Sequence, residues 1–409
     1  MSAPARARPS PGGAARPLPD RIGAALHVQT ARLIGGGGSP AQVWLVRTAG
    51  GDSLVVKVLA ARDGIVDGHD LGSFSVKPRQ IRAVHRWLPR LSPYYAEVVG
   101  EWRGPGWAAY AMPYYRGAEV TAPLRREGIH LPGFLAELEG IFRVLTELGY
   151  AAWSRPAPPG QFGSVHLDRA RRRLPLLRRY LDPELFSADP VLVNGRQCLT
   201  LPRLLSRLSA DDRLNAALQP ARLHFPVHGD LNLGNLVLRP GTGVPRFVVL
   251  DPRGTLRFWD PVYDFAKSLF SLTAFEPALA AGFTVTHRPD PAGRSHYQVS
   301  LRGDHRGLLD AAIEFVPLLA RIPFVAELDR VDPGWRRRLL YAHAVHCLAE
   351  AACRLSDRKP RAYPDARGWD ACLLLARGLY LVGLVLLNDL VGAAEDVSPR
   401  AHLGWLATD

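Results

Sequence analysis

The stretch that decides the fold is FPVHGDLNLGNLVLRPGTGVPRFVVLDPRGTL, residues 225–256. Its apolar segments LVL and RFVVL predict two short strands, and the PGTGVP segment between them predicts the turn of a hairpin. A hairpin brings its two ends together, so we expect Asp230 and Asn235 at one end and Asp251 at the other to converge on one cavity.

Two carboxylates and an amide oxygen are hard ligands suited to Mg²⁺, which takes its remaining ligands from phosphates and water. The order His-x-Asp-x4-Asn, followed by an Asp at the end of the next strand, is the arrangement of a phosphoryl-transfer catalytic loop. The alternative is that these polar residues only cap a buried hairpin. The motif therefore favours a phosphoryl-transfer site, and the alternative is a purely structural role in capping the hairpin.

The composition indicates a folded protein of two or three structural units, because 47% of the 409 residues are hydrophobic. The four cysteines form no C-x-x-C pair and the N-terminus has no apolar signal core, so we expect a cytoplasmic protein. The segment 371–391 approaches the length of a membrane span. It carries Arg377, Asn388 and Asp389, which favours a buried core helix and no membrane span.

The formal net charge of +13 suggests nucleic acid at first sight. Only four of the 51 basic residues are lysines, and the arginines are spread along the chain. The one dense run, Asp168 to Leu181, has leucines at helical spacing and predicts an amphipathic helix with a solvated basic face. We therefore expect no nucleic-acid partner.

The order of elements predicts an α+β fold. Residues 1–20 are too polar and proline-rich to order themselves and are expected to form a disordered tail. From residue 28 to residue 59 the pattern predicts antiparallel strands, followed by a helix within 77–91 and strands near 95–102 and 107–112. Beyond Gly117 the apolar spacing is mostly helical, apart from the opening stretch and a hairpin at 282–303.

The motifs HGDLNLGN, LDPRG and WDPVYDFAKSLFS resemble the aminoglycoside phosphotransferase and choline kinase-like family of small-molecule kinases. The likeness covers most of Ala31 to Leu272, and Gly229 stands where protein kinases usually have Arg. The LDPRG motif is most similar to a subset associated with bacterial polysaccharide and sugar metabolism. The resemblance implies a two-lobed protein-kinase-like fold, with a nucleotide-binding lobe at 21–115 and a helical catalytic and acceptor-binding lobe at 116–409.

The resemblance also implies the roles of the motif residues. Asp230 would be the catalytic base or would orient the acceptor, while Asn235 and Asp251 would bind Mg²⁺. His228 and Asp264 would support the catalytic loop.

The small lobe should bind the nucleotide, with ATP expected and GTP as the alternative. Lys57 lies in the middle of an apolar strand and matches the lysine that contacts the α and β phosphates in this resemblance. The backbone of 111–114 would meet the adenine. The remaining nucleotide-binding candidates are the glycine loop and two hinge residues: Gly35, Gly36, Gly37, Gly38, Met112 and Tyr114. A plain hairpin turn and an ordinary strand end are the alternatives.

One part of the family pattern is missing. No Glu occurs between Lys57 and Glu97 to pair with the lysine, and Gln80 or Asp70 is the nearest candidate partner. A non-catalytic, nucleotide-binding pseudokinase or regulatory protein therefore stays open. A protein kinase is disfavoured by Gly229 and by the absence of an A-P-E motif.

The acceptor is expected to be a small molecule with a hydroxyl group. Because the chain is basic and has Arg253 and Arg257 close to the proposed metal site, a neutral or anionic sugar or sugar-containing metabolite is favoured over a polycationic aminoglycoside. Arg253 itself either contacts substrate or pairs with a carboxylate. The oligomeric state is not predicted.

A further set of polar residues lies on one predicted helix, YAHAVHCLAEAA. His343, His346 and Glu350 share a helix face and suggest a metal site, but with no closing ligand we favour a polar seam in a helical core.

Overall fold

Most of the chain is placed in the computed structural model, which describes residues 17–34, 40–62, 66, 68–122, 131–241, 243, 245–289, 295–357, 359, 366–393 and 398–407. Residues 1–16 of the expected tail lie outside this range. Helix α1 (Asp20–Ala25) already begins at the end of that tail, and its Ile22 is fully buried in an apolar cluster with residues of the neighbouring sheet.

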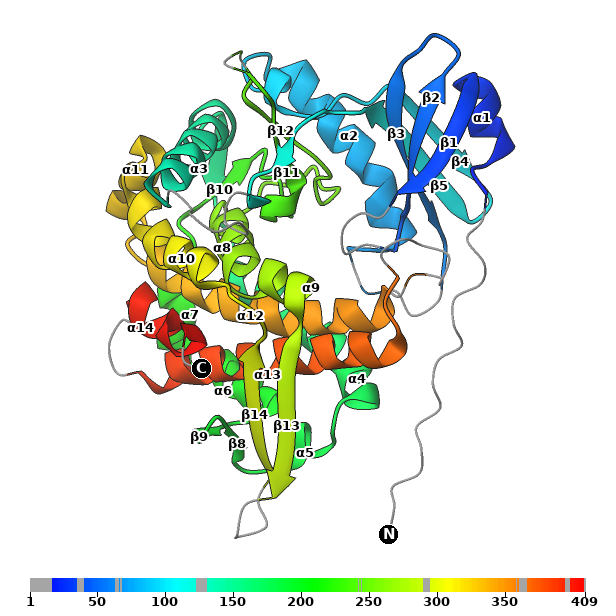
Figure 1. The fold of residues 1–409 in the computed structure, drawn as a ribbon. Helices are drawn as coiled ribbons and strands as arrows, with labels where there is room; N and C mark the ends of the chain where they lie inside the picture. The colour runs from blue at the N-terminus through cyan, green and yellow to red at the C-terminus, as the bar shows by residue number, and fades with distance from the viewer. Residues whose placement is uncertain are drawn as a thin grey trace.

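A five-stranded antiparallel sheet forms the small lobe, with strand order β1-β2-β3-β5-β4 (Figure 1). The strands are β1 (Val28–Ile34), β2 (Gln42–Thr48), β3 (Ser53–Ala60), β4 (Gly100–Gly104) and β5 (Trp107–Pro113). Buried and less buried side chains alternate along most of β3, because successive side chains of a strand face opposite sides of the sheet. The predicted sheet is confirmed, although the strand expected from residue 95 begins only at Gly100.

Helix α2 (Leu71–Trp87) packs between this sheet and the rest of the chain (Figure 1). It begins six residues before the predicted helix, because the side chain of Asp70 caps it by accepting a hydrogen bond from the Ser73 amide at 2.9 Å. Pro78 lies inside the helix. The earlier start places Lys77 in the middle of the helix, where its side chain reaches the cavity between the lobes.

The opening stretch forms the predicted hairpin. Strands β11 (Leu236–Leu238) and β12 (Phe247–Val249) pair antiparallel with Leu236 opposite Val249, and β6 (Ala118–Glu119) adds a third strand. The turn η5 (Leu233–Asn235) precedes β11, and η1 (Ser92–Tyr94) contacts β12. Asn235 and Asp251 therefore lie at the same end of the hairpin, as predicted from the way a hairpin brings its two ends together.

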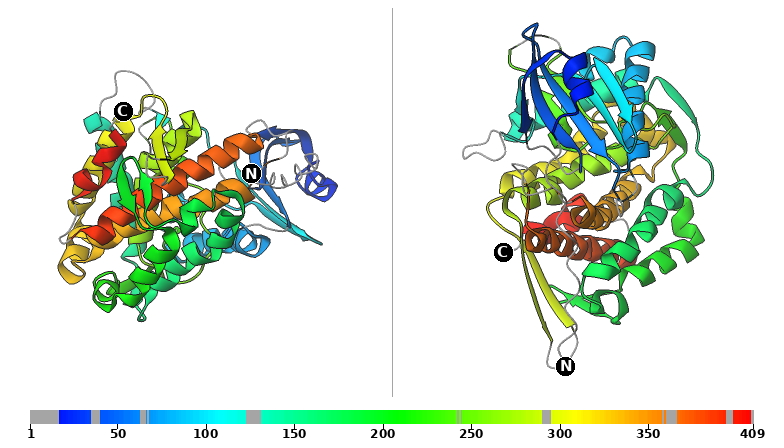
Figure 2. Two further views of the ribbon diagram at one scale, coloured as in Figure 1. Left: turned by 90° about the horizontal axis from the view of Figure 1, so that it is seen from below. Right: turned by 90° about the vertical axis from the view of Figure 1, so that its right-hand side faces the viewer.

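Two further sheets complete the strands. β7 (Trp153–Pro156) pairs with β10 (Arg222–Phe225). The order of the last sheet is β13-β14-β8-β9, and its strands are β8 (Val191–Val193), β9 (Arg196–Cys198), β13 (Phe283–Pro289) and β14 (Ser295–Leu301). The β13–β14 ribbon is the predicted hairpin and projects away from the helices (Figure 2).

Helices make up most of the second lobe. They are α3 (Leu131–Leu145), η3 (Thr146–Tyr150), η4 (Gly163–Leu167), α4 (Asp168–Tyr180), α5 (Glu184–Ser187), α6 (Leu201–Ala210), α7 (Asp212–Ala217), α8 (Val262–Phe270), η6 (Ser271–Phe275), α9 (Glu276–Ala281), α10 (Arg306–Ala320), α11 (Pro323–Val331), α12 (Trp335–Ser356), α13 (Trp369–Gly392), α14 (Pro399–Leu403) and η7 (Gly404–Ala407). The α+β fold, with a small antiparallel lobe and a large helical lobe, is thus confirmed.

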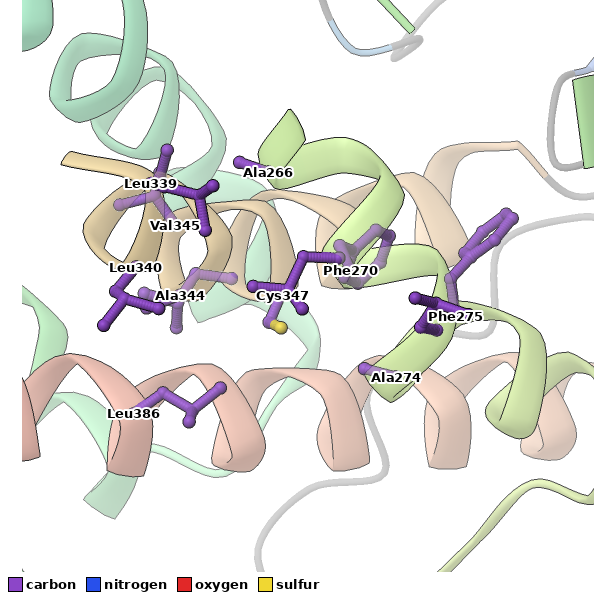
Figure 3. Packing of buried hydrophobic residues seen from close by; sticks show 14 of the residues in the cluster. Ala266, Phe270, Ala274, Phe275, Leu339, Leu340, Ala344, Val345, Cys347 and Leu386 are labelled. Atoms are coloured by element: carbon purple, nitrogen blue, oxygen red, sulfur yellow. The ribbon is translucent and has the colours of Figure 1, made fainter. Parts of the chain in front are cut away.

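Helices α12 and α13 run side by side through the centre of this lobe (Figure 1). Figure 3 shows Ala266 and Phe270 of α8 beside Cys347 of α12, within one buried apolar cluster. This packing fixes α8, which carries Asp264 and Lys267, against the core of the lobe. Helix α13 alone among the described helices is long and apolar enough for a bilayer, but 72% of its apolar window is buried against the chain, as expected of a core helix.

The basic helix α4 differs from its prediction. Its basic face was expected to be solvated, but Arg169 and Arg173 are buried. Arg169 donates to the Tyr263 hydroxyl at 2.9 Å, and Arg173 donates to the Ala349 carbonyl at 2.7 Å. The leucine spacing alone did not show that α12 and α8 would cover part of this face.

Candidate active site

A cavity of about 670 Å³ lies between the sheet and the helical lobe. One end is lined by β3, β5 and the segment after β5, and the other by α8, α9 and α12. Asp230, Asn235 and Asp251 all line this cavity, and they connect its two ends, since Asp251 contacts Lys57 of β3 and Asp230 contacts Lys267 of α8. The structure therefore brings together the polar residues of the opening stretch, as their spacing predicted.

The loop before η5 is held by a buried histidine. His228 donates from Nε2 to the Leu250 carbonyl at 2.9 Å and accepts at Nδ1 from the Asp230 amide at 3.3 Å. Burial lowers the pKa of His228 to about 4, so the ring is neutral and can make both bonds at once. The ring thereby links the loop to the strand end just before Asp251.

Asp264 at the start of α8 accepts three hydrogen bonds, each at 2.8 Å. The donors are the amides of His228 and Gly229 and the hydroxyl of Tyr150. Burial raises the pKa of Asp264 to about 7, although these three donors favour the ionised form. The helix and the loop are thereby joined through one buried carboxyl group.

Gly229 has a backbone conformation that favours glycine, with φ at +78°. A Cβ atom there would lie 2.8 Å from the Trp259 ring and 3.0 Å from the Arg253 Cβ. The larger residue found in protein kinases would not fit this position without moving the loop.

The Gly229→Ala variant is expected to lower the free energy of unfolding by about 2–4 kcal/mol, because it adds a steric clash to an unfavourable φ. Gly160→Ala is the matched control, since Gly160 has a φ of +73° but nothing within 4 Å of a Cβ atom. Urea denaturation of both variants separates the clash from the backbone effect. Equal losses of unfolding free energy in the two variants would contradict the expected clash, because they would show that the loop moves to accommodate the added methyl group.

Asp230 is paired with a lysine that the sequence analysis did not select. Lys267 of α8 lies 2.9 Å from its Oδ1, and the Asn232 amide donates to the same oxygen at 3.2 Å. Burial would raise the pKa of Asp230, but Lys267 and Lys77 outweigh it and hold the pKa well below the usual range. Asp230 is therefore a carboxylate, and its contacts with the described side chains are made through Oδ1.

Asp251 is enclosed by three donors. Lys77 lies 2.7 Å from Oδ1 and Lys57 lies 3.1 Å from Oδ2, while Tyr110 donates to Oδ1 at 2.9 Å. Burial would raise the pKa of Asp251, but the two ammonium groups hold it well below the usual range. Its φ of +53° is rare outside glycine, and such backbone strain is concentrated at functional sites.

Both proposed helix partners of Lys57 are wrong, because its ion-pair partner is Asp251. Asp70 caps α2, as described above. Gln80 spans the space between the lobes, donating to the Val227 carbonyl at 3.0 Å and accepting from the amides of Gly254 and Thr255 at 2.8 Å.

Some of the residues predicted to bind the nucleotide lie at the end of the cavity that β3 and β5 line. Val55, Met112 and Tyr114 line it, together with Lys57. The Tyr114 amide donates to the Ser53 carbonyl at 2.9 Å, so this one group is used within the lobe, and the contact of 111–114 with adenine stays a prediction. Gly35, Gly36, Gly37 and Gly38 lie outside the described residues.

The donor set fits a magnesium ion on one condition. The Asn235 side-chain amide donates to the Asp230 carbonyl at 2.8 Å, which leaves its Oδ1 for a metal. Asp251 supplies the carboxylate, but both of its oxygens already accept from ammonium groups. Oδ1 accepts from Lys77 and Tyr110, whereas Oδ2 accepts from Lys57 alone, so a metal ion would have to bind through the second lone pair of Oδ2.

The end of the cavity that α8, α9 and α12 line contains charged side chains that were not predicted to lie there. Glu350 and Arg354 of α12 form an ion pair, and Lys267 lies 4.0 Å from Glu350. Arg354 and Lys267 lower the pKa of Glu350 to about 2, although burial acts in the opposite direction. The Arg354 guanidinium also lies 5.6 Å from the centre of the Phe275 ring. All four residues line the cavity.

The two arginines near Asp251 lie differently from each other. Arg253 lines the cavity, stacks over Trp259 at 5.5 Å and donates to the Tyr263 hydroxyl at 3.2 Å. Within the described part of the chain it has no carboxylate at ion-pair distance, so that alternative is wrong. Arg257 is exposed and does not line the cavity, contrary to the expectation that both arginines flank the site.

The histidines of α12 form a polar seam. His343 bonds to the Thr273 hydroxyl at 2.7 Å and to His402 at 3.2 Å, while His346 bonds to Arg169 at 3.1 Å. Among the described residues they form no metal-binding group with Glu350. The predicted seam therefore describes the two histidines, whereas Glu350 belongs to the cavity.

Comparison with known proteins gives a family match. The model of the family described as "Phosphotransferase enzyme family" matches residues 30–297. A search of curated proteins gives no match.

Solved structures similar to this chain include an aminoglycoside phosphotransferase from Streptomyces rimosus in complex with ADP and streptomycin. It is 17% identical, and the match covers 74% of this chain and 94% of that one, with a TM-score of 0.40. A glucosamine kinase is 15% identical over 89% of this chain and 93% of its own, with a TM-score of 0.44.

Proposed function

Because the chain belongs to the phosphotransferase enzyme family, whose members transfer a phosphoryl group to a hydroxyl group, we propose that it uses ATP to phosphorylate a neutral or anionic sugar-like acceptor. The observation that supports this most is the position of Asp230. It lies between the end of the cavity that β3 and β5 line, where the nucleotide would bind, and the end that α8, α9 and α12 line, where the acceptor would bind. Its carboxylate is ionised.

Asp230 would orient the acceptor. Lys267 and Asn232 hold Oδ1, so Oδ2 can accept a hydrogen bond from the acceptor hydroxyl and align its oxygen with the γ-phosphate. The hydroxyl proton passes to this carboxylate as the new bond to phosphorus forms, while the bond between the γ-phosphorus and the bridging oxygen breaks and ADP is released. Catalysis then depends mainly on position and charge neutralisation.

Lys57 would bind the phosphates of ATP, and Asn235 and Asp251 are the residues that would hold Mg²⁺. When bound, the ion supplies charge neutralisation at the phosphate oxygens. GTP is the alternative nucleotide, because the described hinge residues do not distinguish the two bases.

The charges at the acceptor end support the choice of acceptor. Asp230 and Glu350, the two carboxylates nearest to Lys267, are each already paired with a cation. Arg253 adds a further positive charge to the lining of the cavity. A polycationic aminoglycoside needs unpaired carboxylates, whereas a neutral sugar can hydrogen bond to such charged pairs and pack on Phe275.

A panel assay tests this proposal. The purified chain is incubated with ATP, Mg²⁺ and one acceptor at a time from three groups: neutral sugars and nucleosides, sugar acids and sugar phosphates, and kanamycin-like aminoglycosides. We expect phosphorylated product in the first or second group. Efficient phosphorylation of aminoglycosides alone would overturn the acceptor class but leave the phosphotransferase activity intact.

Lys267 gives a prediction on pH. Replacing it with Met removes the nearest cation from Asp230, so the pKa of Asp230 rises and the acidic limb of kcat/KM moves to higher pH. We expect kcat to fall about ten- to hundredfold as well. Lys267→Arg keeps the charge and is the control. Profiles measured between about pH 4 and pH 8 that coincide for wild type and Lys267→Met would contradict this role.

A further inference from the structure

Two lysines, and not one, face the proposed phosphate site. Lys57 comes from β3 and Lys77 from α2, and both line the cavity beside Asp251. The side chains of Lys57, Lys77 and Asp251 are only 14%, 9% and 13% exposed. Three groups of this charge in a largely buried position leave one positive charge in excess.

This excess charge is unfavourable for the protein alone. The ammonium groups of Lys57 and Lys77 contact the two oxygens of one carboxylate, so they lie close enough to repel each other. Helix α2 carries no acidic residue that could balance the charge. An ammonium group has three donors, and the single carboxylate of Asp251 serves both lysines. The arrangement is therefore complementary to a polyanion in the cavity.

The metal site leads to the same conclusion. A metal ion on Oδ2 of Asp251 would lie beside the Lys57 ammonium group, and the repulsion between the two cations would weaken the pairing of Lys57 with the carboxylate. An ammonium group displaced in this way stays in the same cavity, where the phosphate oxygens of a nucleotide can accept hydrogen bonds from it.

We propose that Lys77 is a second phosphate-binding lysine of the nucleotide site, which together with Lys57 lets the protein bind ATP in part without a divalent metal. This inference rests on the proposed function and adds to it a residue on α2. It also assigns a role to the positive charge of Lys77, which lies on the helix where the family pattern predicts a glutamate.

Nucleotide affinity with and without metal tests the proposal. Calorimetry with ATP, ADP and AMP is carried out on the full chain, once with Mg²⁺ and once with EDTA. For wild type we expect measurable ATP binding in EDTA. Lys77→Met should weaken ATP binding in EDTA by about ten- to hundredfold, ADP binding less, and AMP binding hardly at all.

Two further variants complete the test. Arg79→Met removes an exposed charge from the same helix and should leave all affinities unchanged. Lys77→Glu places a carboxylate near Lys57 and should abolish ATP binding in EDTA while Mg²⁺ restores much of it. Thermal unfolding shows whether each variant is folded.

The outcomes separate this inference from the proposed function. If Lys77 only positions Asp251 for the metal, Lys77→Met will weaken binding in Mg²⁺ and leave binding in EDTA unchanged, which would overturn the inference. A wild-type protein that binds ATP only with Mg²⁺ would also overturn it, while the proposed function would stand. No ATP binding under either condition would contradict the proposed function itself.

Discussion

Replacing Asp230 with Asn is expected to lower kcat by about two to four orders of magnitude and to leave the affinity for ATP nearly unchanged. The carboxylate lies at the meeting point of the two ends of the cavity, where it would contact the acceptor and not the nucleotide. An amide keeps the shape but cannot accept the hydroxyl proton. Turnover and calorimetric affinity for ATP are measured on the same preparation.

Asp310→Asn on the exposed side of α10 is the matched control and should behave as wild type. Lys267 loses its charged partner in Asp230→Asn, so the unfolding free energy is measured as well. A folded Asp230→Asn protein with wild-type turnover would remove Asp230 from the reaction.

The second large effect is expected for Asp251→Ala. Among the residues that the structure describes, this change removes the only carboxylate at ion-pair distance from Lys57 and Lys77, and with it a proposed metal ligand. We expect kcat to fall by about three orders of magnitude and ATP affinity in Mg²⁺ by at least about tenfold. In EDTA the affinity should be unchanged or tighter, because both ammonium groups become free for phosphate oxygens.

Asp251→Asn is the control of equal size, and it keeps the Tyr110 hydrogen bond available while removing the charge. Calorimetry in Mg²⁺ and in EDTA gives the required pair of affinities. An unchanged affinity in Mg²⁺ for both variants would place the metal elsewhere.

The fold and the centre of the site could be predicted from the sequence because their signals are local. The strand pairs, the β11–β12 hairpin and the meeting of Asp230, Asn235 and Asp251 follow from period and loop length. Asp264 was assigned to the loop only through the family resemblance, and the structure shows its contacts with the amides of His228 and Gly229.

The charge partners could not be predicted, because they depend on distances between elements far apart in the chain. Lys57 pairs with a residue 194 positions later, and Glu350 reaches Lys267 from a different helix. One signal was available, since the chain has only four lysines and three of them line the cavity: Lys57, Lys77 and Lys267. In a chain where arginine supplies most positive charge, each lysine was a candidate for the site.

The most direct test of the account is transfer of the γ-phosphate itself. The purified chain is given [γ-³²P]ATP, Mg²⁺ and the three groups of acceptors, and Asp230→Asn is run in parallel. The account predicts that wild type transfers label to at least one hydroxyl acceptor. Asp230→Asn should form labelled product at a rate at least about a hundredfold lower. Label transferred equally by both proteins, or bound ATP with no labelled product from any acceptor, would contradict it.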